Sequence, residues 1–114
     1  MSGIQILHNP RCSKSRQTLT LLEEQGVDAE IVLYLENTPS KAELEGIIAK
    51  LGLSVRDITR TGEDAYKENN LKEASDEELL DAMLKFPKLI ERPIVIHGDK
   101  AAVGRPPESV LAIL

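Results

Sequence analysis

The first 36 residues combine two apolar, strand-like segments with one helical segment. "GIQILHN" has a short apolar centre and predicts a strand at about residues 4–7, and "DAEIVLYLE" predicts a second strand. Between them, residues 13–25 carry leucines at a helical spacing, and Gly26 follows as a stop signal. A strand, a helix of about a dozen residues and another strand form a βαβ unit, whose strands should be parallel with a right-handed crossover. The chain therefore predicts an α/β fold.

The middle of the chain predicts helices. Ser40 and Glu43, and again Ser75 and Glu78, have the spacing of a capping box, in which a serine oxygen and a glutamate carboxylate satisfy amides at a helix start. The two predicted helices run to about Leu51 and to just before Pro87. "SVRDITR" predicts a short helical piece, and the polar segment after it should be irregular or loosely helical. We expect a helical insertion over about residues 38–90.

The end of the chain predicts two strands and a helix. "PIVIH" and "KAAVG" are strand-like, and the Gly98-Asp99 link between them suits a tight hairpin. "PPESVLAIL" predicts a final helix with proline at its start. The expected order is β-α-β, a helical insertion, then β-β-α. We expect residues 1–114 to form a single domain around a mixed four-stranded sheet.

Composition excludes several functional classes. The net charge is −5, which argues against a general nucleic-acid role, because phosphate backbones are bound mainly by excess Lys and Arg. No apolar run approaches the ~20 residues that cross a bilayer, and the start of the chain lacks the pattern of a signal peptide. One cysteine allows no internal disulfide and, with two well-separated histidines, no recognisable metal site. We expect a cytoplasmic protein without membrane, nucleic-acid or metal partners.

The single cysteine, Cys12, lies in the polar loop "HNPRCSKS". A lone cysteine is more often a small buried hydrophobic residue, but this one immediately precedes the first predicted helix and follows Arg11. Helix-start amides, the helix dipole and nearby cations stabilise a thiolate and can lower its pKa into the range of about 3.5 to 7.5. Cys12 is therefore a candidate nucleophile. The same helix start can also bind an anion.

Two neighbours of Cys12 have two possible roles each. The Ser15 hydroxyl can donate a hydrogen bond to an anion, yet a serine this early in a helix is also an ordinary cap. His8, at the end of the first strand, is able to set the protonation state of the thiol or simply to hydrogen-bond a loop carbonyl. The residues alone do not decide between these roles.

Three arginines are candidate anion ligands. Arg60 ends "SVRDITR", while Arg92 and Arg105 each directly precede a proline, which biases their backbones toward an extended shape. A guanidinium group is always charged and offers a planar fork that fits tetrahedral oxyanions. A thiolate facing such a cluster suits nucleophilic attack on an oxyanion, with the arginines holding charge on its oxygens.

These motifs together resemble the glutaredoxin-dependent arsenate reductase family. The resemblance runs along nearly the whole chain and rests on "HNPRCSKS", "LYLENTPSKAEL", Arg60, "ERPIVI" and "GRPPE", in family order. It implies a thioredoxin-like fold with a helical insertion, in agreement with the predicted order of elements. It also implies that Cys12 attacks arsenate, that Arg60, Arg92 and Arg105 bind and polarise the oxyanion, and that His8 and Ser15 tune the thiol.

The family's reaction cycle implies the partners. Cys12 would form a thiol–arsenate adduct that glutathione attacks, two-electron reduction would release arsenite, and glutaredoxin would resolve the remaining cysteine–glutathione disulfide. Glutathione is then a co-substrate, no tightly bound cofactor is expected, and the missing second thiol comes from partners. We place Asn9, Arg11 and Pro93 on the substrate or glutathione side of the site, and we expect a monomer.

Pro93 carries one structural expectation of its own. A proline at the start of a central strand removes a hydrogen-bond donor from the sheet and needs a local reason. In thioredoxin-like folds, which this chain resembles, a cis-proline precedes this strand and lies opposite the active-site cysteine. We therefore expect a cis Arg92–Pro93 bond, although only about 5–6% of such bonds in folded proteins are cis.

Two other functions remain open. One is an enzyme on the same scaffold that acts on a glutathione-linked thiol, because family resemblance defines the site better than the substrate. The other is a transcription regulator of the Spx kind, which shares the fold and binds RNA polymerase. Such regulators usually carry a Cys-x-x-Cys switch, whereas position 15 here is serine. The arginine set also favours the enzyme.

Overall fold

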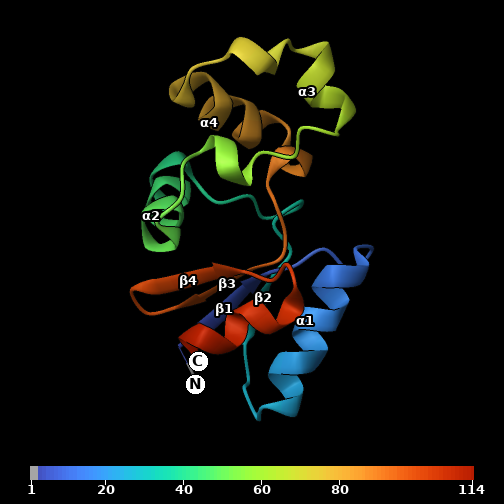
Figure 1. Ribbon diagram of the computed structural model, residues 1–114, viewed down its shortest axis with the longest axis vertical. Coiled ribbons are helices and arrows are strands. Elements are labelled where there is room, and N and C mark those ends of the chain that lie inside the picture. Colours follow the sequence, from blue (N-terminus) through green and yellow to red (C-terminus); the bar gives the residue numbers. More distant parts are fainter. Residues whose placement is uncertain (1–2) are drawn as a thin grey trace. The chain divides into compact units, whose positions relative to one another are not determined.

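The computed structural model describes residues 3–114, which form two compact units. One unit contains the described residues up to Asn37 together with Arg92–Leu114, and the other is Thr38–Glu91. Figure 1 shows the elements of each unit along the chain. The two units are described separately below.

The first unit is built on a mixed four-stranded sheet. Its strands are β1 (Ile4–Leu7), β2 (Glu30–Val32), β3 (Ile94–His97) and β4 (Lys100–Val103), in the order β2-β1-β3-β4. β1 and β2 are parallel, whereas β1 with β3 and β3 with β4 are antiparallel. The predicted sheet is therefore confirmed, and so is the two-residue link between β3 and β4.

One face of this sheet carries the core of the first unit. α1 (Ser13–Glu24) and the 3₁₀ helix η4 (Pro107–Ile113) cover that face, and Figure 1 shows both on the same side of the strands. Ile6 is paired with Val95 across β1 and β3, so their side chains share a face. The core cluster consists of Ile4, Ile6, Leu22, Val95 and Val110.

Two elements differ from the sequence prediction. β2 covers only residues 30–32, not the whole of "DAEIVLYLE", because the carbonyl of Leu33 accepts hydrogen bonds from the amides of Glu36 (2.9 Å) and Asn37 (2.8 Å) and the chain turns away from the sheet. The final helix is 3₁₀ instead of α-helical. Its inward residues, Pro107, Val110 and Ile113, are spaced by three, which aligns them on a helix with 3.0 residues per turn.

The second unit is helical. Its elements are α2 (Lys41–Leu51), η1 (Arg56–Ile58), α3 (Asp64–Glu68), η2 (Leu71–Glu73), α4 (Asp76–Lys85) and η3 (Pro87–Leu89). Both predicted capping boxes are present, at Ser40 and at Ser75. Gly52 ends α2 in the left-handed conformation, with φ 69°, which glycine adopts without a steric penalty.

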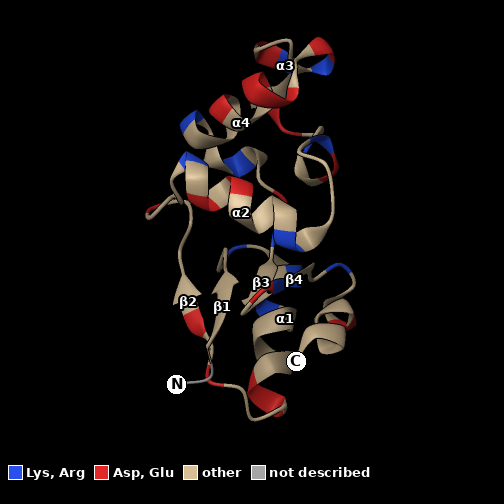
Figure 2. Ribbon diagram, turned by 90° about the vertical axis from the view of Figure 1, so that its left-hand side faces the viewer, with Lys and Arg blue, Asp and Glu red and all other residues tan. Residues whose placement is uncertain are grey.

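Charge on α4 follows the helix dipole. Its first turn carries Asp76, Glu77 and Glu78, and its last turn carries Lys85. All four side chains are exposed, and Figure 2 shows the acidic residues of this helix in red. The acidic run "SDEELLD" is therefore the solvated face of an amphipathic helix, whose apolar side buries Leu79, Leu80 and Met83.

Candidate active site

Cys12 is the residue immediately before α1. Its amide donates a hydrogen bond to the carbonyl of Asn9 (3.0 Å), and its carbonyl accepts a hydrogen bond from the amide of Arg16 (3.0 Å). The loop therefore turns sharply into the helix. The backbone of Cys12 is extended, with φ −93° and ψ 123°, as is usual for a residue that caps a helix. Its sulfur is half-buried at the start of the helix, where the backbone amides of Ser15 and Lys14 act on the thiol pKa. The thiol thus occupies the predicted place at the positive end of the helix.

The surroundings of Cys12 lower the pKa of its thiol. Partial burial acts in the opposite direction and raises this pKa. The Ser15 amide, the Arg92 guanidinium and the Lys14 amide all favour the charged form, and together they outweigh burial. The structure therefore supports a reactive thiolate, which is the form of cysteine that acts as a nucleophile.

Two of the three candidate arginines approach the sulfur. Nη2 of Arg105 lies 3.3 Å from Sγ of Cys12, and Nε of Arg105 donates to the carbonyl of Arg92 (2.7 Å). The half-buried Arg92 is the arginine whose charge and hydrogen bond lower the thiol pKa. Arg105 is exposed, so water screens its charge more strongly. The expected approach of both arginines to Cys12 is present in the structure.

Both arginines precede cis-prolines. The Arg92–Pro93 bond is cis, which confirms the expectation from the sequence, and the Arg105–Pro106 bond is cis as well, which the sequence analysis did not anticipate. The two segments are joined by a hydrogen bond from the Gly104 amide to the Pro93 carbonyl (2.9 Å).

Gly104 is a functional position that the sequence analysis missed. A Cβ atom at residue 104 would lie 2.5 Å from Oγ1 of Thr18 and 2.8 Å from Cγ of Pro93, closer than real Cβ contacts come. Only glycine therefore lets the residue before Arg105 lie against α1, the helix that Cys12 caps. The sequence signal was the glycine in "AVGRPP", between the last strand and a candidate ligand.

His8, Asn9 and Ser15 form a buried hydrogen-bond cluster beside Cys12. Oγ of Ser15 accepts a hydrogen bond from the Asn9 amide (3.0 Å) and lies 2.6 Å from Nδ1 of His8. Burial, and then the charge of Arg16, lower the pKa of His8, so its ring is neutral near pH 7. The Ser15 hydroxyl thus holds the end of β1 to the helix start. It is the backbone amide of Ser15, not its hydroxyl, that lowers the pKa of Cys12.

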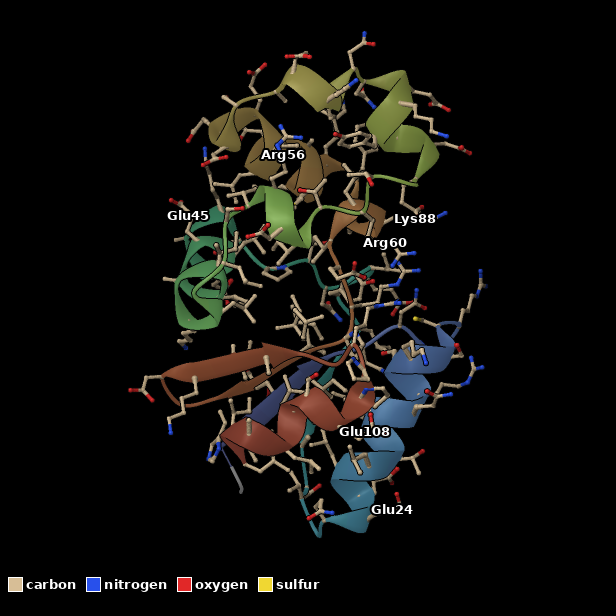
Figure 3. All side chains as sticks on the ribbon, in the orientation of Figure 1. Glu24, Glu45, Arg56, Arg60, Lys88 and Glu108 are labelled. Carbon is tan, nitrogen blue, oxygen red and sulfur yellow. The ribbon has the colours of Figure 1, made fainter. Side chains whose placement is uncertain are left out.

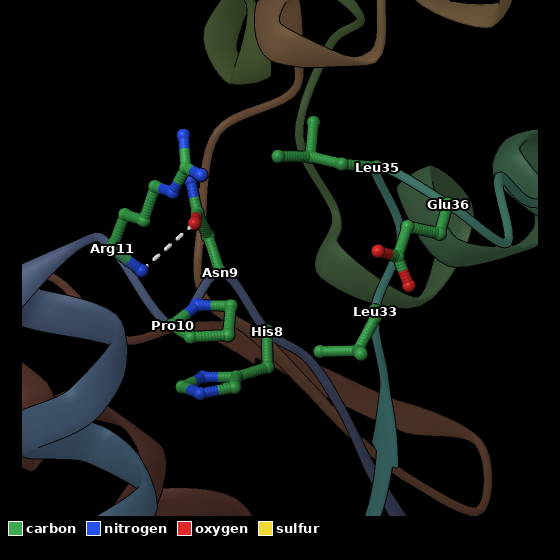
Figure 4. Close-up of a pocket in the computed structure, with 7 residues that line it drawn as sticks. All are labelled: His8, Asn9, Pro10, Arg11, Leu33, Leu35 and Glu36. Atoms are coloured by element: carbon green, nitrogen blue, oxygen red, sulfur yellow. Dashed lines mark hydrogen bonds between the residues drawn. The ribbon is translucent and has the colours of Figure 1, made fainter.

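Arg11 lies on the rim of a cleft in the first unit. Its amide donates to Oδ1 of Asn9 (3.0 Å). The cleft has a volume of about 220 Å³ and lies between the loop at residues 8–11 and the segment at residues 33–36. Figure 4 shows these two walls facing each other.

Arg60 lies in the second unit, where two carboxylates hold it. Nη1 contacts Oε1 of Glu91 (2.9 Å), and Nε contacts Oε2 of Glu63 (3.3 Å). Its amide donates to the carbonyl of Leu89 (2.8 Å), and Figure 3 labels its side chain. Burial lowers the pKa of Arg60, but Glu91 and Glu63 outweigh burial and raise it. Its charge is therefore already compensated within its own unit.

Two features are absent from the part of the chain that the structure describes. Within residues 3–114, no group of three or more His, Cys, Asp or Glu side chains is placed to hold a metal ion. Over the same range, no helix has both the length and the apolar character needed to span a membrane.

Comparison with known proteins places this site in a family. The chain is 50% identical to an arsenate reductase of Neisseria meningitidis serogroup A over the full length of both chains. It is 53% identical to an arsenate reductase of Haemophilus influenzae, with 96% of this chain and 97% of the relative covered. It superposes on an arsenate reductase structure from Vibrio cholerae with a TM-score of 0.94, 52% identity and 97% of both chains covered.

The fold of these neighbours is thioredoxin-like, as the sequence predicted for this chain. The model of the ArsC family matches residues 7–113, a range that includes Cys12 and all three candidate arginines. With a family match over almost the whole length and relatives at about half identity, the chain belongs to the ArsC family.

Proposed function

We propose that the protein is an arsenate reductase in which Cys12 is the nucleophile and glutathione and glutaredoxin supply the electrons. The observation that carries the proposal is the lowered thiol pKa of Cys12, beside two arginines that approach its sulfur. Relatives named as arsenate reductases at about half identity support arsenate as the substrate.

In the first step, the Cys12 thiol condenses with arsenate. A sulfur–arsenic bond forms, one arsenate oxygen leaves as water, and arsenic keeps the oxidation state +5. A thiolate is needed for this attack, and the lowered pKa of Cys12 favours that form. Arg92 and Arg105 donate hydrogen bonds to the oxyanion and stabilise the charge that develops on its oxygens.

In the second step, glutathione attacks the sulfur of Cys12. The sulfur–arsenic bond breaks, its electron pair passes to arsenic, and arsenite leaves with arsenic at +3. The thiol proton of glutathione ends on an arsenite oxygen, so atoms and electrons balance. The Cys12–glutathione disulfide is then reduced by a thiol of glutaredoxin, which takes the glutathione. This cycle needs no second cysteine in the chain and no tightly bound cofactor.

The remaining assignments complete the proposal. His8 and Ser15 act by holding the loop that presents Cys12, because their contacts are with each other and with the Asn9 amide. Arg60 is proposed as the third oxyanion ligand, for which its guanidinium must leave at least one of its two carboxylate partners. A monomer in the reducing cytoplasm is the state that we propose for the cycle.

A coupled assay tests the proposal. Arsenate, glutathione, glutaredoxin, glutathione reductase and NADPH are mixed with the protein, and NADPH oxidation is followed. We expect arsenate-dependent oxidation that requires both thiol donors and is lost in Cys12→Ser. Turnover that survives in Cys12→Ser would refute the mechanism. No turnover with arsenate, together with reduction of a glutathione-linked thiol substrate, would assign the other enzymatic function instead.

A further inference from the structure

The cleft beside the Cys12 loop has the features of a binding site. It lies where the parallel strands β1 and β2 end, because residues 8–11 follow β1 and residues 33–36 follow β2. Small ligands in α/β proteins bind at the carboxyl ends of parallel strands. Its volume, about 220 Å³, is enough for a large part of a small peptide.

The two walls of the cleft carry opposite charges. Arg11 stands on one wall and Glu36 on the other, and the carboxylate of Glu36 points into the space between the walls (Figure 4). Within residues 3–114, neither the Arg11 guanidinium nor the Glu36 carboxylate takes part in a salt bridge or a side-chain hydrogen bond. The two charges are thus available to a ligand that carries both a carboxylate and an ammonium group.

The space between the charges is lined by apolar groups. Leu33 and Leu35 on one wall and Pro10 on the other contribute methyl and methylene surface. Leu35 leaves 37% of its surface exposed, so part of this apolar lining is open to a ligand. A ligand with a short aliphatic body between its charged ends would cover this surface.

We propose that this cleft binds glutathione, with the γ-glutamyl ammonium facing Glu36, a carboxylate of the tripeptide facing Arg11, and the methylene groups over the leucines. The inference rests on the proposed function, which requires glutathione. Arg11 lines the cleft and directly precedes Cys12, so the cleft adjoins the loop that carries the proposed nucleophile.

Binding is tested without any arsenate chemistry, by titrating the ¹⁵N-labelled full chain with S-methylglutathione, which cannot react with Cys12. We expect amide shifts in residues 8, 9 and 11 and in residues 33–36. Glu36→Gln and Arg11→Gln should each weaken binding about two- to fivefold, the range for a partly exposed ion pair. Glu23→Gln and Lys100→Gln, which make the same charge changes at exposed positions outside the cleft lining, are matched controls and should bind as the wild type does.

A second ligand isolates the contact with Glu36. N-acetylation of S-methylglutathione removes the ammonium group, and it should weaken binding to the wild type about as much as Glu36→Gln does. It should cause no further loss in the Glu36→Gln variant, because the partner of the ammonium is already gone. An N-acetylation penalty that persists in Glu36→Gln, or shifts confined to residues outside the cleft, would overturn the proposal.

The outcome is separable from that of the coupled assay. If the charge dependence of binding holds but arsenate is not turned over, the proposed function fails and the glutathione site stands. If arsenate is turned over while both cleft variants keep the wild-type affinity for S-methylglutathione and the wild-type KM for glutathione, the proposed function stands and this inference fails.

Discussion

The Nη2 atom of Arg105 lies 3.3 Å from the sulfur of Cys12, although the two residues are 93 positions apart in the chain. A guanidinium group donates hydrogen bonds and accepts none, so this contact favours a thiolate over a thiol. The end of the last strand thus adds one donor to the Arg92 guanidinium and the backbone amides that lower the pKa of Cys12.

The alkylation of Cys12 should report this charge state. Because backbone amides and Arg92 lower the thiol pKa, we expect the rate of reaction with iodoacetamide to rise with pH around a midpoint below the ordinary cysteine value of ~8.5. The measurement is the second-order rate constant between pH 5 and pH 10, with glutathione as the control thiol. A midpoint at or above ~8.5 would contradict the assignment of Cys12 as a thiolate near neutral pH.

Arg92→Lys and Arg105→Lys should impair turnover more than folding. Lysine keeps the positive charge but loses the planar fork, and a hydrogen bond to a charged group contributes ~1.5–3 kcal/mol. We expect kcat/KM for arsenate to fall about tenfold or more in each variant, with the free energy of unfolding changed by less than about 1 kcal/mol. If unfolding accounts for the whole loss of activity, the two arginines are structural and not oxyanion ligands.

Gly104→Ala should lower the stability of the protein and change the pKa of the Cys12 thiol. The added Cβ would meet Thr18 Oγ1 at 2.5 Å and Pro93 Cγ at 2.8 Å, and overpacking of this kind costs typically ~1–3 kcal/mol. Relief of the clash displaces the backbone at residue 104, which directly precedes Arg105. The midpoint of Cys12 alkylation should therefore shift as well. Urea unfolding and the alkylation profile are the two measurements.

Two further variants make the Gly104 prediction specific. Thr18→Ala removes the nearest atom and should recover part of the stability lost in Gly104→Ala. Gly46 lies in the interior of α2 with open space around its Cβ position, so Gly46→Ala should stabilise the protein by about 0.5–1 kcal/mol. Equal effects of alanine at residues 46 and 104 would refute a packing role for Gly104.

His8 should make stability depend on pH. Its pKa in the folded protein lies below the ordinary value of 6.5, so the unfolded chain binds more protons in the acidic range. The contribution of His8 to stability is therefore complete above pH 6.5 and is lost as the pH falls through the folded pKa. We expect His8→Asn to flatten the decline in the free energy of unfolding between pH 7 and pH 5, and an unchanged decline in this variant would contradict the assignment.

Local sequence signals determined most of the elements. The capping boxes at Ser40 and Ser75 and the tight link at Gly98-Asp99 depend on residues within a few positions of one another, so their geometry follows from short-range chemistry. The place of Cys12 before a helix was predictable for the same reason. Motifs in family order added the thioredoxin-like fold and the cis bond before Pro93, which no local pattern predicts by itself.

Tertiary structure decided what each of these residues contacts. Three arrangements bring together residues between 3 and 86 positions apart: the packing of Gly104 against Thr18, the pairing of Arg60 with Glu63 and Glu91, and the placement of Arg11 and Glu36 on one cleft. The sequence alone specified these residue types but not their partners, because a side-chain contact depends on how the chain brings distant segments together. Strand pairing and helix packing brought Arg92 and Arg105 to the loop of Cys12, where Arg92 lowers the thiol pKa and Arg105 contacts the sulfur.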